Sequence, residues 1–136
     1  MPTPPDWVLA EMPDGPRLGR RIKAFRESGE FHHLVQGDDS FSGALAAINI
    51  GRELRSEYPS VRFSVTRPRH GAIRIAWKNG PSITEVAGLT GKYAASRVIV
   101  TSPGRIPRLT VWLGVFGGAD SIILARPRSA AGEYND

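Results

Sequence analysis

Hydrophobic and polar residues alternate along residues 61–78, and this alternation is typical of β-strands. Every second residue is apolar from Val61 to Val65 and again from Ile73 to Trp77, so each stretch has one apolar side when it is extended. The residues RPRHG between the two stretches contain a proline and a glycine, as turns do. The pattern therefore predicts an antiparallel hairpin with one face in the core and the other in solvent.

Apolar residues at helical spacing predict a first helix before this hairpin. The segment FSGALAAINIGRELRSEY predicts a helix from Phe41 to Tyr58, which Pro59 ends. Ser40 or Ser42 is in place to cap its start. We expect its buried face to consist of Phe41, Ala44, Leu45, Ala47, Ile48, Leu54 and Tyr58.

A second helix is predicted directly after the hairpin. The residues NGP turn the chain, and Ser82 with Glu85 three residues later is a capping-box pattern, which predicts the start of a helix. Its apolar stripe extends to Tyr93, but Gly88 and Gly91 weaken it.

The C-terminal third of the chain is rich in apolar residues and predicts two further strands. These are LTVWLGVF, from Leu109 to Phe116, and SIILAR, from Ser121 to Arg126, with GGAD between them as a second hairpin turn. The first of them is apolar on both faces, which fits a central strand, a surface covered by the N-terminal residues or an interface with a partner. We favour cover by the N-terminal residues, and we expect a loop at residues 102–108.

Together these elements predict an α+β fold. We expect a two-layer sandwich, in which one antiparallel sheet of two hairpins carries two helices on one face, in the order α-β-β-α-β-β, over residues 41–126. Residues 1–40 are predicted to form an N-terminal arm with a short basic segment, and the five prolines among residues 1–16 argue against a regular element there. Residues 127–136 are predicted to be a disordered tail.

The composition suits a globular domain with an anionic partner. The 136 residues include 18 basic and 13 acidic side chains, a formal net charge of +5, and the only lysines are Lys23, Lys78 and Lys92. Arginine binds phosphate and carboxylate groups in a bidentate manner, although codon usage in a GC-rich genome also favours arginine. The sequence has no cysteine, which excludes disulfides, and no apolar stretch of membrane-spanning length, which indicates a cytoplasmic protein of the host cell.

Two basic segments are the candidate surfaces for such a partner, which is nucleic acid or an acidic protein or nucleoprotein surface. Alternation places cations on the solvent face of the predicted hairpin, and others lie at its turn. The segment 17–26 is also basic, with a docking helix that has a solvated basic face as the alternative interpretation. The candidate residues are Arg62, Arg74 and Lys78 on the hairpin face, Arg67, Arg69 and His70 at its turn, and Arg20, Arg21 and Lys23 in the segment.

Enzymatic chemistry has little support in the sequence. Acidic residues are sparse, and no glycine-rich phosphate loop stands between a strand and a helix. His32, His33, Asp38 and Asp39 share one loop, but adjacent histidines point in different directions and no third ligand has the spacing of a metal site. We therefore expect no catalytic residues, no metal site and no cofactor.

Three stretches, LRSEYPSVRFSV, IRIAWKNGPSITEV and FGGADSIILARP, resemble the large polyvalent protein-associated domain of the twenty-ninth type. The resemblance covers residues 41–126, and Asn79 stands where that family commonly has aspartate. It implies a protein of a phage or conjugative element that is delivered with invading DNA, and it implies no catalytic residue set. The most specific positions are Tyr58, Pro59, Phe63, Ser64, Val65, Trp77, Asn79, Gly80 and Pro81.

We therefore expect a non-enzymatic accessory protein of a phage or mobile genetic element that binds nucleic acid or a nucleoprotein through a basic sheet face. The alternative is a protein inhibitor of a host defence complex, of the anti-CRISPR or anti-restriction type, that docks on an acidic surface. A third interpretation is an accessory domain that forms a homodimer through its edge strand or through the apolar face around Trp112.

Overall fold

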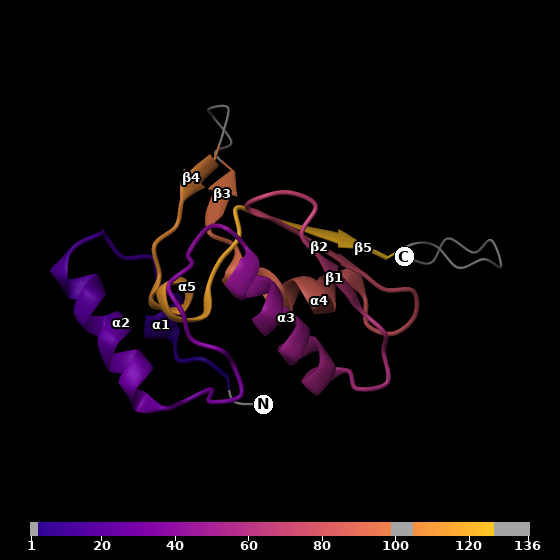
Figure 1. The fold of residues 1–136 in the computed structure, drawn as a ribbon, viewed down its shortest axis with the longest axis horizontal. Coiled ribbons are helices and arrows are strands. Elements are labelled where there is room, and N and C mark those ends of the chain that lie inside the picture. The colour runs from indigo at the N-terminus through magenta and orange to yellow at the C-terminus, as the bar shows by residue number, and fades with distance from the viewer. Residues whose placement is uncertain (1–2, 99–104, 127–136) are drawn as a thin grey trace.

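The computed structural model describes residues 3–98 and 105–126 of the chain (Figure 1). The predicted disordered tail lies outside the described residues, as do residues 102–104 of the predicted loop. In chain order the elements are α1 (Asp6–Leu9), α2 (Pro16–Ser28), α3 (Ala44–Glu57), β1 (Ser64–Thr66), β2 (Ala72–Ala76), α4 (Ile83–Thr90), the 3-10 helix η1 (Gly91–Tyr93), β3 (Ser96–Val98), β4 (Arg105–Pro107), α5 (Val111–Phe116) and β5 (Ser121–Ala125).

Strands β1, β2 and β5 form a three-stranded mixed sheet in the order β1-β2-β5. β1 and β2 are antiparallel, so the predicted first hairpin is confirmed, although β1 begins at Ser64 and not at Val61. β5 runs parallel to β2, with Ile122 opposite Ile73. The fold is therefore α+β, as predicted, but the all-antiparallel sheet of two hairpins is wrong, because the last strand pairs with β2 in the same direction.

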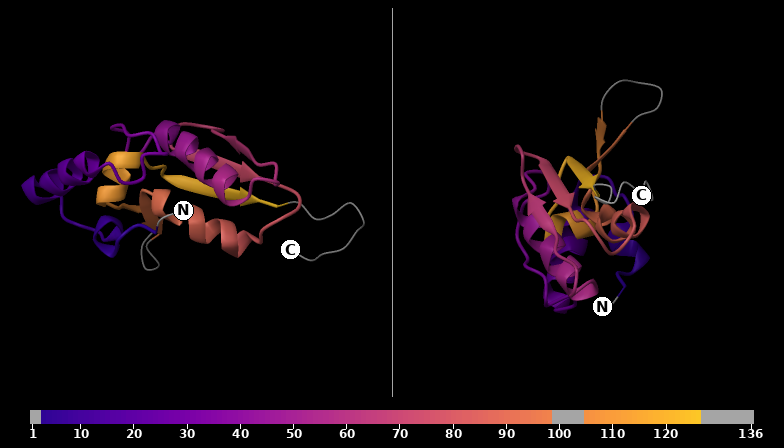
Figure 2. Two further views of the ribbon diagram at one scale, coloured as in Figure 1. Left: turned by 90° about the horizontal axis from the view of Figure 1, so that it is seen from below. Right: turned by 90° about the vertical axis from the view of Figure 1, so that its right-hand side faces the viewer.

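Helices α3 and α4 lie on one face of this sheet (Figures 1 and 2). The side chains of Ile73, Ile75 and Trp77 alternate onto that face and are buried. Arg74, between the two isoleucines, is exposed, so the other face of the sheet is open at this position. The capping box predicted for α4 is confirmed, because Ser82 and Glu85 exchange hydrogen bonds of 3.1 Å between side chain and backbone in both directions.

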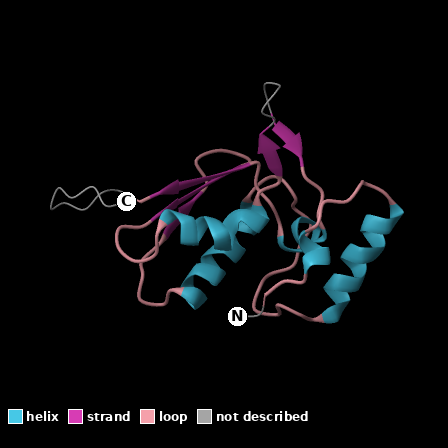
Figure 3. Cartoon of the chain, turned by 180° about the vertical axis from the view of Figure 1, so that it is seen from behind, coloured by secondary structure: helices cyan, strands magenta, loops and turns pink. Residues whose placement is uncertain are grey.

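A short antiparallel ribbon of β3 and β4 stands apart from the three-stranded sheet (Figure 3). Arg105–Pro107 form β4, so the loop predicted at residues 102–108 is wrong for these residues. The backbone of Arg108, just after β4, donates a hydrogen bond to the carbonyl of Ala95, just before β3, at 2.8 Å. This bond closes the base of the ribbon.

The segment LTVWLGVF, predicted to be a strand, forms helix α5 from Val111 to Phe116. All residues of α5 are buried, and the Thr110 hydroxyl caps the helix by accepting a hydrogen bond from the backbone N–H of Leu113 at 3.1 Å. A helix buried on every side is apolar on every side, so periodicity cannot distinguish its sequence from that of a central strand. The strand prediction is wrong for this reason.

The N-terminal residues cover α5, as expected, but they do so with helices. α1 and α2 both contact α5, and the ring of Phe25 in α2 lies 6.2 Å from that of Trp112 and 5.8 Å from that of Phe116. The prediction of no regular element in residues 1–16 is wrong. The prolines flank α1, and Pro16 begins α2 at a position where a backbone N–H has no partner within the helix.

Residues 1–40 and the sheet contribute to one hydrophobic cluster. Val8, Leu18 and Phe25 belong to the same cluster of buried residues as Ile73 and Trp112. Side chains from both sides of residue 40 are therefore removed from water together. The domain boundary predicted at residue 40 therefore stays a prediction from the sequence.

Helix α3 is rotated about its axis relative to the face expected from its apolar residues. Ile48 is 51% exposed, whereas Asn49 is fully buried and Glu53 is only 2% exposed. The Asn49 side chain makes hydrogen bonds of 2.7–2.8 Å with the backbone of Val35 and Phe116. Because buried polar side chains with partners can occupy the core face, the pattern of apolar residues alone misplaces it.

The carboxylate of Asp39 holds the start of α3. It accepts hydrogen bonds from the backbone N–H groups of Ser42 at 2.9 Å and Leu45 at 3.2 Å, and the Ser42 hydroxyl accepts one from Ala44 at 3.2 Å. Ser42 thus takes part in capping, as predicted, although Gly43 occupies the cap position itself. Burial acts to raise the pKa of Asp39, but its hydrogen bonds outweigh that effect, and its pKa lies below the usual value.

Candidate nucleic-acid interface

The hairpin of β1 and β2 carries predicted site residues on the sheet face that α3 and α4 do not cover. Arg74 in β2 is paired with Ile123 in β5, and both side chains are exposed. Continuing the β1–β2 register by two residues places Arg62 opposite Lys78, and both are again exposed. Since an extended chain rises roughly 3.3 Å per residue, Arg74 and Lys78 stand about 13 Å apart along the strand. The open face therefore carries a row of cations.

The turn of the hairpin adds further cations. Arg67, Arg69 and His70 are exposed there. The Arg67 guanidinium donates a hydrogen bond to the carbonyl oxygen of Ser42 at 2.9 Å, and the backbone N–H of Gly71 donates to the same oxygen at 2.8 Å. These bonds fix the turn against the residues that precede α3. Within the described residues, none of the hairpin cations forms an ion pair with a carboxylate.

A groove of about 780 Å³ lies where the two strands of the hairpin end. Its lining combines the cations Arg62 and Lys78 with the rings of Phe63 and Trp77, whose centroids are 5.7 Å apart. No carboxylate side chain lines it. Cations bind phosphate groups, so Arg62 and Lys78 suit this groove to a nucleic acid backbone, whereas Trp77 is only 3% exposed and supports the wall from the core side.

Positions that carry the family resemblance build the wall of this groove. The indole N–H of Trp77 donates a hydrogen bond to the carbonyl oxygen of Pro81 at 2.9 Å, which ties the end of β2 to the start of α4. Gly80 between them has a φ of +122°, and a Cβ there would lie 2.7 Å from a methyl group of Val61. The turn therefore requires glycine at this position.

The remaining predicted site residues, Arg20, Arg21 and Lys23, lie in α2, at the opposite end of the molecule from the hairpin groove (Figures 1 and 2). The structure therefore does not bring the two basic segments together into one surface. Lys23 stands 3.9 Å from Glu27 in an exposed pair one helical turn apart, whereas Arg21 lies over the ring of Trp7 at 5.5 Å.

A buried polar cluster that the sequence did not predict joins α3 to η1. The ammonium of Lys92 donates hydrogen bonds to a carboxylate oxygen of Glu53 at 2.9 Å and to the carbonyl oxygen of Leu89 at 2.6 Å. The Tyr93 hydroxyl donates to the other carboxylate oxygen of Glu53. The Lys92 ammonium also lies 5.3 Å from the ring centroid of Trp112.

Burial perturbs the titration of this cluster. Burial lowers the pKa of Lys92 below its usual value, and the neighbouring Glu53 carboxylate offsets only part of this shift. Burial and the Glu53 charge together raise the pKa of the Tyr93 hydroxyl well above its usual value. Tyr93 therefore keeps its proton over the whole physiological pH range and remains a hydrogen-bond donor to Glu53.

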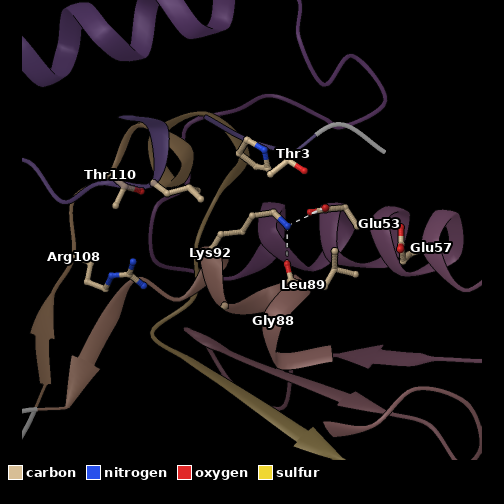
Figure 4. A pocket seen from close by; sticks show the side chains of 11 residues that line it. Thr3, Glu53, Glu57, Gly88, Leu89, Lys92, Arg108 and Thr110 are labelled. Atoms are coloured by element: carbon tan, nitrogen blue, oxygen red, sulfur yellow. Dashed lines mark hydrogen bonds and ion pairs between the residues drawn. The ribbon is translucent and has the colours of Figure 1, made fainter. Parts of the chain in front are cut away.

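The cluster borders a hollow of about 540 Å³ between α3, η1 and the N-terminal residues (Figure 4). Glu57 and Arg108 also line it, so its four charged side chains are two acids and two bases. Both carboxylate oxygens of Glu53 and the ammonium of Lys92 are already engaged by protein groups. We therefore interpret this cluster as a link that holds α3 against η1.

Residues 41–129, more than half of the chain, match the family model described as Large polyvalent protein associated domain 29. Searches of curated proteins and of solved structures gave no match. In the part of the chain that the structure describes, no helix has both the length and the apolar character needed to cross a membrane. Among the same residues, no three or more His, Asp or Glu side chains come together in a position to hold a metal ion.

Proposed function

The chain belongs to the Large polyvalent protein associated domain 29 family, and we propose that it is a non-enzymatic accessory protein of a phage or mobile genetic element that binds nucleic acid in the host cytoplasm. Family membership supports the mobile-element context. The hairpin supports the binding function. The proposed binding residues are Arg62, Arg67, Arg69, His70, Arg74 and Lys78.

The absence of carboxylates from the lining of the hairpin groove carries this proposal. Arg62 and Lys78 face one groove without a carboxylate beside them, and Arg74 continues the row on the open sheet face. Like charges gathered on one surface repel one another and raise the free energy of the folded state. A polyanion relieves that repulsion, and it also gains the entropy of the counterions that its phosphates release.

The proposed contacts are mainly to phosphate groups. Contacts of this kind position a protein on nucleic acid without reading its sequence. We therefore expect sequence-independent binding, with DNA and RNA both as ligands.

The proposal is tested by direct binding to labelled oligonucleotides of about 20 nucleotides, single-stranded and duplex, after the protein has been treated with nuclease and repurified. We expect binding at low salt that weakens steeply as salt rises. No binding at 50 mM salt, or binding that is equally tight at 50 and 200 mM salt, would refute it, because phosphate contacts cannot be independent of counterions.

An inhibitor of a host defence complex, of the anti-CRISPR or anti-restriction type, is the second candidate function. The observation that favours it is Ile123, which is 40% exposed beside Arg74 on the open sheet face. Arginine next to an exposed apolar side chain is typical of protein interfaces. Capture of the same host protein complex with and without nuclease, together with no affinity for free nucleic acid, would favour this function over the first.

A further inference from the structure

Three arginines and a tryptophan surround a second hollow, on α2. The hollow has a volume of about 410 Å³ and is lined by Trp7, Arg17, Arg20, Arg21 and Ala24. The four lining residues from α2 follow one another at spacings of three, one and three residues, which places them on one face of the helix. Trp7 is 38% exposed and stands beside this face.

The charges around this hollow are all positive. No carboxylate lines it, and none of its three guanidiniums forms an ion pair within the described residues. Arg26, one further turn along α2, differs: its guanidinium donates hydrogen bonds to the carbonyl oxygens of Gly37 at 2.6 Å and Gly114 at 2.7 Å. Arg26 therefore supports the fold, whereas the charges of the arginines around Trp7 are not neutralised by a carboxylate of the described residues.

The chemistry of this hollow matches a nucleic acid backbone. Arginine guanidiniums bind phosphate oxygens in a bidentate manner. Arg21 lies over the Trp7 ring, so the indole helps to position this guanidinium at the hollow. As in the hairpin groove, cations line the hollow and no carboxylate does. The two sites are separate, because they lie at opposite ends of the molecule (Figure 1).

The β3–β4 ribbon projects from the body of the molecule between α2 and the three-stranded sheet (Figures 1 and 3). A straight duplex laid across the open sheet face toward α2 would meet this ribbon. Duplex DNA bends little over the length of one small domain, because its persistence length is about 150 base pairs. The two basic sites are therefore placed for two different nucleic acid segments.

We infer that one copy of the chain bridges two nucleic acid segments, one on the hairpin and one on the hollow of α2. This inference rests on the proposed function of the hairpin and adds a second site to it. Bridging by a single domain would hold two strands, or two distant parts of one molecule, close together without a protein dimer.

A two-duplex capture assay tests the inference. One duplex of about 20 base pairs is fixed to beads, a second one is fluorescent and free, and the full chain is added at increasing concentration. We expect capture of the fluorescent duplex that first rises and then falls, because excess protein occupies every duplex separately. The variant Arg17→Gln/Arg20→Gln should lose this capture to the level of protein-free beads while still binding a single duplex within about twofold of the unmodified chain.

The variant Arg52→Gln/Arg55→Gln removes the same charge from exposed positions on α3, outside both sites, and should capture normally. If the unmodified chain binds one duplex but captures no second, bridging is wrong and the proposed function stands. If the chain binds no duplex, the proposed function itself fails. Equal loss of capture in both double variants would overturn the α2 site, since net charge alone would then explain the effect. Full capture by the Arg17→Gln/Arg20→Gln variant would overturn it as well.

Discussion

The salt dependence of binding gives the most direct test of the hairpin surface. We consider the variant Arg74→Gln/Lys78→Gln in a chain that already carries Arg17→Gln and Arg20→Gln, so that binding at α2 does not mask the result. Arg74 and Lys78 are exposed and make no ion pair within the described residues, so glutamine at these positions leaves the fold intact.

The size of the effect follows from the number of cations. The hairpin presents five side chains with a permanent positive charge, namely Arg62, Arg67, Arg69, Arg74 and Lys78. If each neutralises one phosphate of a duplex, the logarithm of the binding constant falls with the logarithm of salt concentration with a slope of about −4.5, and removing two cations changes the slope to about −2.7. Between 50 and 200 mM salt the parent chain then loses about 500-fold in affinity and the variant about 40-fold.

Fluorescence anisotropy of a labelled duplex, titrated at four or more salt concentrations, measures this slope. Arg52→Gln/Arg55→Gln in the same background is the matched control, since it also removes two exposed positive charges. Its slope should equal that of the parent chain, because both residues lie on α3, which packs on the sheet face opposite the row of cations (Figure 1). Thermal melting of each variant checks that all of them are folded.

Two results would refute the reasoning. A slope that is reduced equally in the hairpin variant and in the control would show that net charge, and not the row of cations on the hairpin, sets the affinity. A slope that stays near −4.5 in the hairpin variant would show that Arg74 and Lys78 contact no phosphate, and the interface would have to be sought on another face.

Three further predictions concern Phe25 in the core, the Asp39 carboxylate at the start of α3, and Tyr93 in the cluster with Glu53 and Lys92. Phe25→Ala should cost about 3–5 kcal/mol in urea unfolding with a single transition, whereas a second transition would show that the N-terminal helices unfold independently. Asp39→Ala should cost about 1 kcal/mol at pH 7 and progressively less as pH falls below the usual aspartate pKa, because the folded-state pKa of Asp39 is lowered and its contribution is lost as pH falls through that pKa. Tyr93→Phe should flatten the loss of stability above about pH 10, because the raised pKa of Tyr93 lets only the unfolded state release the proton there; parallel alkaline curves for variant and parent would contradict this.

The parts of the fold that the sequence predicts correctly are those determined by neighbours along the chain. The hairpin follows from alternation over two short segments joined by a tight turn. The start of α4 follows from Ser82 and Glu85, whose reciprocal hydrogen bonds link residues only three positions apart. Both features depend on contacts within a few residues, so the local pattern contains all the information needed.

The parts that the sequence does not predict depend on distant contacts. Residues 121–125 were recognisable as a strand, but their partner is β2, far back in the chain, and not the segment just before them. Residues 111–116 contact α1, α2, α3 and η1, and burial against these distant elements is the reason that they are apolar on all sides. A run of apolar residues without periodicity reports burial, but it does not report whether the buried element is a helix or a strand.

The candidate site residues also include some that the local sequence predicts and some that it does not. Exposure of Arg62, Arg74 and Lys78 follows from alternation, because the core takes the opposite face. The link between Glu53 and Lys92 joins residues 39 positions apart, and nothing local identifies it. The one available signal is that Glu53 follows Asn49 by one helical turn, so two polar residues stand in line beside the buried apolar row of Ala46, Ile50 and Leu54.

The buried cation has a carboxylate partner, whereas the cations of the hairpin and of the α2 hollow have none in the described part of the chain, and this contrast supports a binding role. Lys92 is largely buried, where an unpaired charge would be costly, and it is matched by Glu53. At the hairpin and on α2, cations gather without partners although Glu57 and Glu85 are also exposed on the surface. Stability alone would favour interspersed charges at these places. Two separate clusters of unmatched arginines are therefore better explained by an anion that binds them than by the needs of the fold.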